Sequence, residues 1–154
     1  MSNIIFRCSD DQKEEIKKGM FEIIHHHYIT SAFPNSNAKY NKEDKAVYAK
    51  RLEDVMNNGL CTFEDVEEGL CVKFDTTEDA GFTIAREVYQ TEGGYNDEGL
   101  TYLGSFFKTV IKKYPDIPFV AECECVDSWV EEEYHVAYDG ESFDTDAPWA
   151  EYEF

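Results

Sequence analysis

The 154-residue chain carries 33 Asp and Glu against 14 Lys and Arg, a formal net charge of −19, with 42% hydrophobic and 15% aromatic residues. This size and composition are typical of one globular domain and exclude a disordered chain. The charge excludes ordinary binding of nucleic acid, which needs Lys and Arg to displace counterions. No apolar run approaches the roughly 20 residues of a membrane span.

The N-terminal stretch "MSNIIFRCSDDQKEE" has neither the basic nor the apolar region of a signal peptide. The five cysteines are odd in number and fit a reducing compartment better than a disulfide framework. We therefore expect a soluble, cytoplasmic protein that makes no contact with a membrane.

Hydrophobic periodicity and capping signals predict alternating strands and helices. Ser9 and Gln12 form a capping box before the first helix, and Asn58-Gly59 is a C-terminal stop for the second. Residues 80–90 fit a strand or a helix equally well. The predicted elements are, in chain order, a strand at 3–9, helices at 10–29 and 41–59, strands at 60–66 and 69–77, a helix at 100–115, and a hairpin of strands 118–128 and 129–140.

This order predicts a single α+β domain over residues 1–154, with a mainly antiparallel sheet and helices on one face, ferredoxin-like or related. The tail at 140–154 mixes acidic and aromatic residues. Two outcomes are open for it: docking on the domain, or remaining mobile.

The predicted closing hairpin places its carboxylates on one side of the sheet, because successive strand side chains alternate between faces. Tyr134, Val136 and Tyr138 are expected to face the core together with Val130. The opposite, solvent-facing side then carries Glu122, Glu124, Glu131, Glu133 and His135. Residues 114–154 contain 13 acidic residues and no Lys or Arg, whereas solvated surfaces usually intersperse both signs.

The stretches "NIIFRCSDDQKEEIKKGMFEII", "GLCVKFDT" and "LGSFFKTVIKKYPDIPFVAECEC" resemble the YubB-like ferredoxin-like domains of plasmids and phages. An opening strand and helix, a strand ending in Phe-Asp-Thr, a helix ending near Tyr-Pro and a closing hairpin follow in the same order. The helix at 41–57 and the acidic tail lie outside the resemblance. It implies a ferredoxin-like fold and a mobile-element setting, and no catalytic residue.

In bulk the chain is also similar to small acidic anti-CRISPR and anti-restriction proteins. Carboxylates two residues apart on a strand lie about 6.8 Å apart, and a paired strand adds a second row about 4.8 Å away, a density comparable to that of duplex DNA. We therefore expect a DNA-mimicking inhibitor that binds a basic nucleic-acid-binding protein, such as a defence nuclease. The expected contacts are Glu122, Glu124, Glu131, Glu133, Asp139, Glu141, Asp144 and Asp146, with Trp129 and Trp149 as aromatic anchors.

Three other interpretations stay open. The acidic surface can serve solubility alone, or the protein can be an immunity protein that neutralises a basic toxin. Alternatively, it is a small zinc-stabilised domain, although C-x-C on a strand is a poor chelate. The candidate zinc ligands are Cys8, Cys61, Cys123 and Cys125, for which buried free thiols are the simpler interpretation.

Catalysis has little support in the sequence. His135 beside Glu133, with Cys71 on the same face, could form a nucleophile–base pair. However, the sequence has no G-x-S-x-G, H-E-x-x-H or P-loop motif. We therefore expect a binding protein that is not an enzyme and needs no cofactor.

Overall fold

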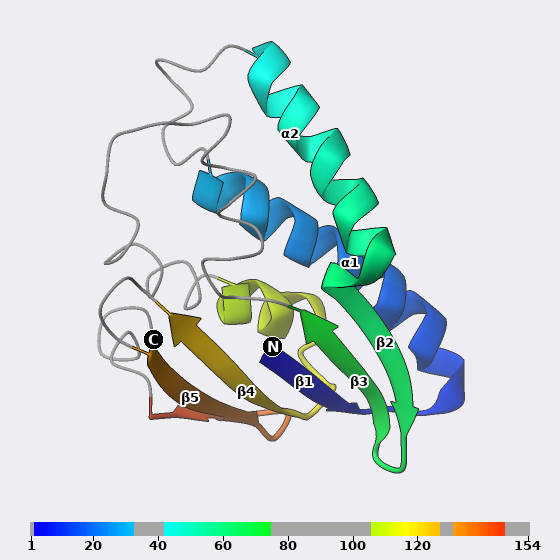
Figure 1. The fold of residues 1–154 in the computed structure, drawn as a ribbon. Helices are drawn as coiled ribbons and strands as arrows, with labels where there is room; N and C mark the ends of the chain where they lie inside the picture. Colours follow the sequence, from blue (N-terminus) through cyan, green and yellow to red (C-terminus); the bar gives the residue numbers. More distant parts are fainter. Residues whose placement is uncertain (1, 33–41, 75–105, 127–130, 147–154) are drawn as a thin grey trace.

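The computed structural model describes residues 2–32, 42–74, 106–126 and 131–146. Within these ranges, six strands form one antiparallel sheet, and the helices lie on one side of it (Figure 1). The helices are α1 (Asp10–Ala32), α2 (Lys42–Val55) and a helix at residues 106–113. The strands are β1 (Ser2–Arg7), β2 (Cys61–Val66), β3 (Gly69–Phe74), β4 (Phe119–Val126), β5 (Glu131–Tyr138) and β6 (Phe143–Thr145).

The strand order is β2-β3-β1-β4-β5-β6, and every neighbouring pair is antiparallel. The first four strands, with α1 after β1 and the helix at 106–113 before β4, have the split β-α-β arrangement of ferredoxin-like folds. Helix α2 and the strands β5 and β6 are additions to that arrangement. The predicted α+β class, with an antiparallel sheet and helices on one face, is confirmed.

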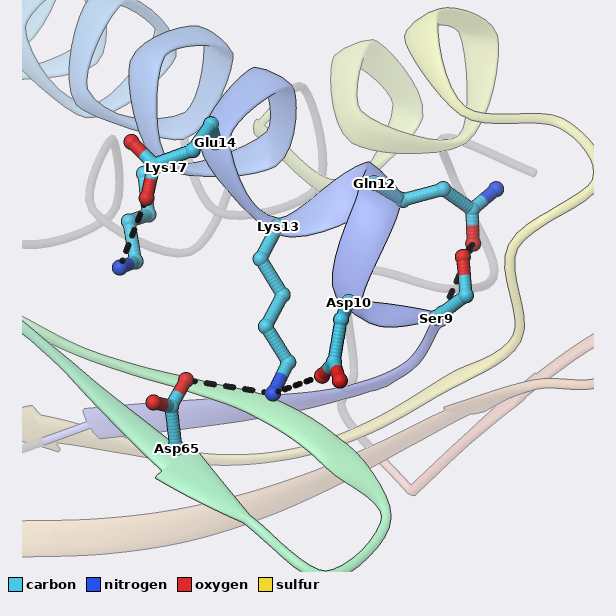
Figure 2. Close-up of polar contacts among 7 residues, drawn as sticks. All are labelled: Ser9, Asp10, Gln12, Lys13, Glu14, Lys17 and Asp65. Atoms are coloured by element: carbon cyan, nitrogen blue, oxygen red, sulfur yellow. Dashed lines mark hydrogen bonds and ion pairs between the residues drawn. The ribbon is translucent and has the colours of Figure 1, made fainter.

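Helix α1 begins where the capping signal predicts (Figure 2). The Ser9 backbone N–H donates to the Gln12 side-chain oxygen at 3.0 Å, and the Gln12 N–H donates to the Ser9 carbonyl at 3.1 Å. The Lys13 ammonium lies 2.8 Å from Asp10 and 3.3 Å from Asp65. Because Asp65 belongs to β2, this ion pair ties the first turn of α1 to the edge of the sheet.

Helix α2 ends through a π-helical turn, Met56–Leu60. The Cys61 N–H donates to the Met56 carbonyl, and Gly59 adopts a φ of 124°. Positive φ is favourable for glycine because it has no Cβ. The predicted stop at Gly59 is therefore confirmed, although regular α-helix already ends at Val55.

The core lies between the helices and the sheet and is rich in aromatic rings. The ring centroid of Phe6 on β1 lies 6.2 Å from that of Tyr114 and 5.6 Å from that of Phe119. Phe107 stacks on Phe119 with ring centroids 5.9 Å apart. Burial of each such side chain stabilises the fold by about 1.5–3 kcal/mol, so these rings fix the helix layer against the middle of the sheet.

Gly69, at the start of β3, is required for the pairing of β3 with β1. Its φ is +149°, and a Cβ there would lie 2.4 Å from the Phe6 carbonyl oxygen and 2.8 Å from the Cys8 nitrogen. Both neighbours are backbone atoms: Phe6 belongs to β1, which pairs with β3, and Cys8 directly follows β1. Neither can move without disturbing the sheet.

We therefore predict that Gly69→Ala destabilises the protein more than Gly59→Ala, the matched control. Both glycines have positive φ, which costs an Ala about 1–2 kcal/mol, but a Cβ on Gly59 meets nothing within 4 Å. The added clash should enlarge the loss for Gly69 by at least about 1 kcal/mol. Urea denaturation followed by circular dichroism measures both, and equal losses would contradict the prediction.

Candidate functional site

The sheet face opposite the helices, called the open face below, brings side chains from all six strands together. The register aligns one residue from each strand into a row that crosses the sheet. The central row is Glu64, Cys71, Ile5, Val120, Ala137 and Asp144. The charged row beside it is Thr62, Lys73, Asn3, Glu122 and His135, and it is continued by Asp146 directly after β6, whose N–H donates to the His135 carbonyl.

The central row is apolar in its middle and acidic at both ends. Val120 keeps 55% of its surface exposed, although β4 is an inner strand of the sheet. Ile5 is half-buried and Ala137 is exposed, while Glu64 on β2 and Asp144 on β6 end the row. A hollow of about 800 Å³ lies over this row and the charged row.

A second hollow, of about 610 Å³, extends the open face on the other side of the central row. Four residues of the central row line both hollows, and Arg7 and Asp139 line only the second one. These shared residues are Ile5, Val120, Ala137 and Asp144. The central row therefore runs along the middle of a broad depression.

Negative charge dominates the half of the open face formed by β4, β5 and β6. Glu122 and Glu133 are exposed, and Glu124 is half-buried. Glu124 lies directly opposite Glu133 across β4 and β5, a like-charge pairing that is unfavourable in isolation. On the other half, the Lys73 ammonium lies 3.0 Å from Glu64, so this cation is already engaged by a carboxylate of the same face.

His135 is held in place by Asp146. The His135 backbone N–H donates to one carboxylate oxygen of Asp146 at 2.7 Å, and Nδ1 of its ring lies 3.0 Å from the other. The hydrogen bond that the Asp146 carboxylate accepts from the ring raises the pKa of His135, and the bonds donated by His135 lower the pKa of Asp146. The second ring nitrogen, Nε2, faces Glu133 at 3.8 Å.

Within the described residues, Glu122, Glu133 and His135 are the one group whose ligand atoms gather closely enough to hold a metal ion, all within 4.8 Å of one another. Imidazole nitrogen and carboxylate oxygen suit borderline and hard divalent ions. All three side chains are exposed, so water competes for each of them. Sequence reasoning assigned these residues to one surface but not to one cluster.

The structure confirms the predicted faces of the hairpin wherever it describes the side chains. Tyr134, Val136 and Tyr138 are buried against the core, and Glu133 and His135 are exposed on the opposite side. Trp129, Trp149 and the side chain of Glu131 lie outside the described residues.

Two of the predicted contact residues lie in the turn between β5 and β6. One Asp139 carboxylate oxygen accepts from the Ser142 N–H at 2.7 Å and from the Glu141 N–H at 2.8 Å. These hydrogen bonds lower the pKa of Asp139 and shape the turn. The turn starts the tail at 140–154, and β6 then pairs with β5, so this part of the tail docks on the sheet.

The candidate zinc ligands do not come together among the described residues. Cys61 and Cys123 are buried in the core on β2 and β4, with β3 and β1 between them. Three strand spacings amount to about 14 Å, too far for one tetrahedral ion. Burial raises the pKa of Cys61 to about 12 and also raises the pKa of Cys8. The side chain of Cys125 lies outside the described residues.

Sequence reasoning missed the half of the open face contributed by β1 and β2. Asn3, Ile5 and Glu64 line the same hollow as His135, although nothing in the local sequence connects them to the hairpin. The alternation within β1 indicates which residues face away from the core. That these residues lie beside β4 depends on strand order, which local periodicity does not encode.

Comparison of the chain with models of known protein families, with functionally characterised proteins and with solved structures gave no match. The resemblance to the YubB-like domains therefore stays a prediction. In the parts of the chain that the structure describes, no helix combines the length and apolar character needed to cross a membrane.

We predict that Asp146→Asn lowers the pKa of His135 toward its ordinary value of 6.5, because the substitution removes the carboxylate that accepts from the ring. An NMR titration of the His135 ring proton measures the shift. Asp144→Asn is the control, since Asp144 is an exposed aspartate two residues away on β6 and is not the acceptor for the ring. Equal shifts in the two variants would contradict the assignment.

The same contact predicts a pH dependence of folding stability. The raised pKa of His135 makes its contribution complete below pH 6.5, and the contribution is lost as the pH rises through the folded-state pKa. The lowered pKa of Asp146 makes its contribution present above pH 3.8, and it is lost as the pH falls through the folded-state pKa. Chemical denaturation at several pH values should therefore show the largest advantage of wild type over Asp146→Asn between pH 3.8 and 6.5. The advantage should shrink above the folded-state pKa of His135, where only the backbone N–H bond to Asp146 remains, and should disappear below the folded-state pKa of Asp146.

Proposed function

We propose that the protein is an inhibitor from a phage or mobile element that binds the nucleic-acid groove of a host defence protein through its acidic open face. The observation that carries the proposal is the charge of the half-face formed by β4, β5 and β6. Its described acidic side chains share one surface, and residues 114–154 contain no Lys or Arg. These acidic residues are Glu122, Glu124, Glu133, Asp144 and Asp146.

The spacing of these carboxylates suits a cationic groove. Glu124 and Glu133 face each other on paired strands, about 4.8 Å apart in the hydrogen-bonding direction. A partner's Lys or Arg placed between them would interact favourably with both carboxylates. Binding to a basic protein therefore gains from this concentration of carboxylates, and the net charge of −19 speeds the encounter.

A binding role also agrees with the environment of Cys71 on the open face. Cys71 is buried, and burial raises its pKa. Its thiol is therefore protonated at neutral pH and is a poor nucleophile. The mobile-element setting of the proposal comes from the sequence resemblance, while the choice of a basic partner comes from the charge of the open face.

The test uses a panel of purified restriction endonucleases and RNA-guided nucleases with fluorescent duplex DNA. Wild type should displace DNA from at least one nuclease. Glu122→Lys combined with Glu133→Lys should weaken that displacement at least about tenfold, or about 1.4 kcal/mol, because it reverses the charge at the contact. The matched control reverses two exposed acidic residues of α2, Glu53→Lys and Asp54→Lys, and should bind like wild type.

Two outcomes would overturn the proposal. One is a wild-type protein that leaves DNA bound to every nuclease of the panel. The other is an equal loss of DNA displacement in both double variants, because displacement would then depend on net charge and not on the position of the charges on the open face. Tight binding to a single nuclease toxin without competition from DNA would favour the immunity-protein interpretation instead.

A further inference from the structure

We infer that the open face binds an amphipathic, basic α-helix of the partner protein. This helix would lie across the strands, along the central row. This inference rests on the proposed function, because both place a cationic protein on the open face. It adds a specific shape and chemistry to the partner: apolar side chains in the middle of the helix and basic side chains toward its ends.

The apolar middle of the central row has no role in repelling or attracting charge. Val120 and Val47 are the two large hydrophobic side chains that are strongly exposed in the described part of the chain, each at 55%. Val47 lies on α2, but Val120 lies between Ile5 and Ala137 in the middle of the sheet. An apolar centre surrounded by a polar rim is the usual composition of a protein–protein interface. A surface that only imitated the phosphate charges of DNA would not need an apolar centre.

The dimensions of the central row suit a helix of about four turns. Six strands at about 4.8 Å spacing place Glu64 and Asp144 roughly 24 Å apart, which is the length of about 16 helical residues. The apolar stretch from Cys71 to Ala137 covers about 14 Å, which suits anchors at i, i+4 and i+7 of a helix. The hollows on both sides of the row give room for the helix flanks.

The acidic ends of the row determine the charge of the helix. Asp144 on β6 is exposed, so this end attracts Lys or Arg. Asp146 directly after β6 is already bonded by His135 and adds less. At the other end Glu64 forms an ion pair with Lys73 at 3.0 Å, so its attraction for a basic side chain of the partner is weaker. A helix that is basic mainly over β6 and apolar over β1 and β4 complements this distribution.

Other occupants fit less well. A second copy of this chain would bring a net charge of −19 against the same acidic ends, and nucleic acid would be repelled in the same way. An extended strand laid flat on the face of a sheet would leave its backbone N–H and C=O groups unpaired. A helix satisfies these groups internally, so it can lie on side chains alone.

The test measures binding of the full-length protein to two synthetic peptides by fluorescence anisotropy. The first is a helical peptide of about 16 residues with leucines at i, i+4 and i+7 in its middle and arginines in its end turns. The second has the same composition, but its leucines are distributed around the helix. Wild type should bind the first peptide at least about tenfold more tightly.

Val120→Asp separates the apolar contact from simple charge attraction. It adds a negative charge to the open face, so a purely electrostatic site would bind both basic peptides more tightly. If the site binds the apolar side of a helix, the variant should instead lose at least about tenfold in affinity for the first peptide. Val47→Asp changes the same residue type at the same 55% exposure on α2 and should leave binding unchanged. Val120→Ser provides a milder variant that should weaken binding in the same direction, if Val120→Asp does not fold.

Equal affinity for the two peptides, or tighter binding of both by Val120→Asp, would overturn the inference. So would a concentration-dependent dimer in sedimentation that Val120→Asp abolishes, because the row would then bind a second copy. If the first peptide binds as expected while no nuclease loses its DNA, the proposed inhibition fails and the helix site stands. If DNA is displaced but the peptides bind alike, the inhibitory function stands and the helix site fails.

Discussion

The register of β1 between β3 and β4 is the constraint on which the rest of the structure depends. Ile4 and Phe6 are fully buried in the core, so Asn3 and Ile5 must face the opposite side of the sheet. A slip by one residue would exchange the two sets and expose the core residues. The tight approach of Gly69 to the Phe6 carbonyl oxygen fixes this register, and both rows of the open face follow from it.

Much of the fold could be predicted because its signals are local. The alternation of Tyr134, Val136 and Tyr138 assigned the faces of the hairpin correctly, and Ser9 with Gln12 located the start of α1. The composition of the rows could not be predicted, because Asn3 and Glu122 are paired but far apart in the sequence. Strand order arises from the packing of the whole sheet, and only that order brings the apolar residues of β1 and β4 together.

Charge counting alone overestimates the surface that a partner can use. Asp139 and Asp146 look like any other acidic residues of the C-terminal segment, yet both carboxylates accept hydrogen bonds within the fold. Asp139 precedes glycine in a turn sequence, and such aspartates commonly bond to the backbone two or three residues onward. Asp146 has no comparable local signal, because its partner His135 lies on the neighbouring strand. Glu122 and Glu133, by contrast, are exposed on the open face, and Glu133 approaches His135 only to 3.8 Å.

In the proposed complex, the two kinds of contact on the open face act at different stages of binding. Carboxylates attract a basic partner over distances up to the Debye length, about 8 Å at physiological salt, and so raise the rate of encounter. They discriminate poorly between one basic protein and another. The apolar residues act only in direct contact, where shape must match. A surface that combines acidic ends with an exposed Val120 at its centre can therefore meet many cationic proteins but retain those that present a helix of matching length and polarity.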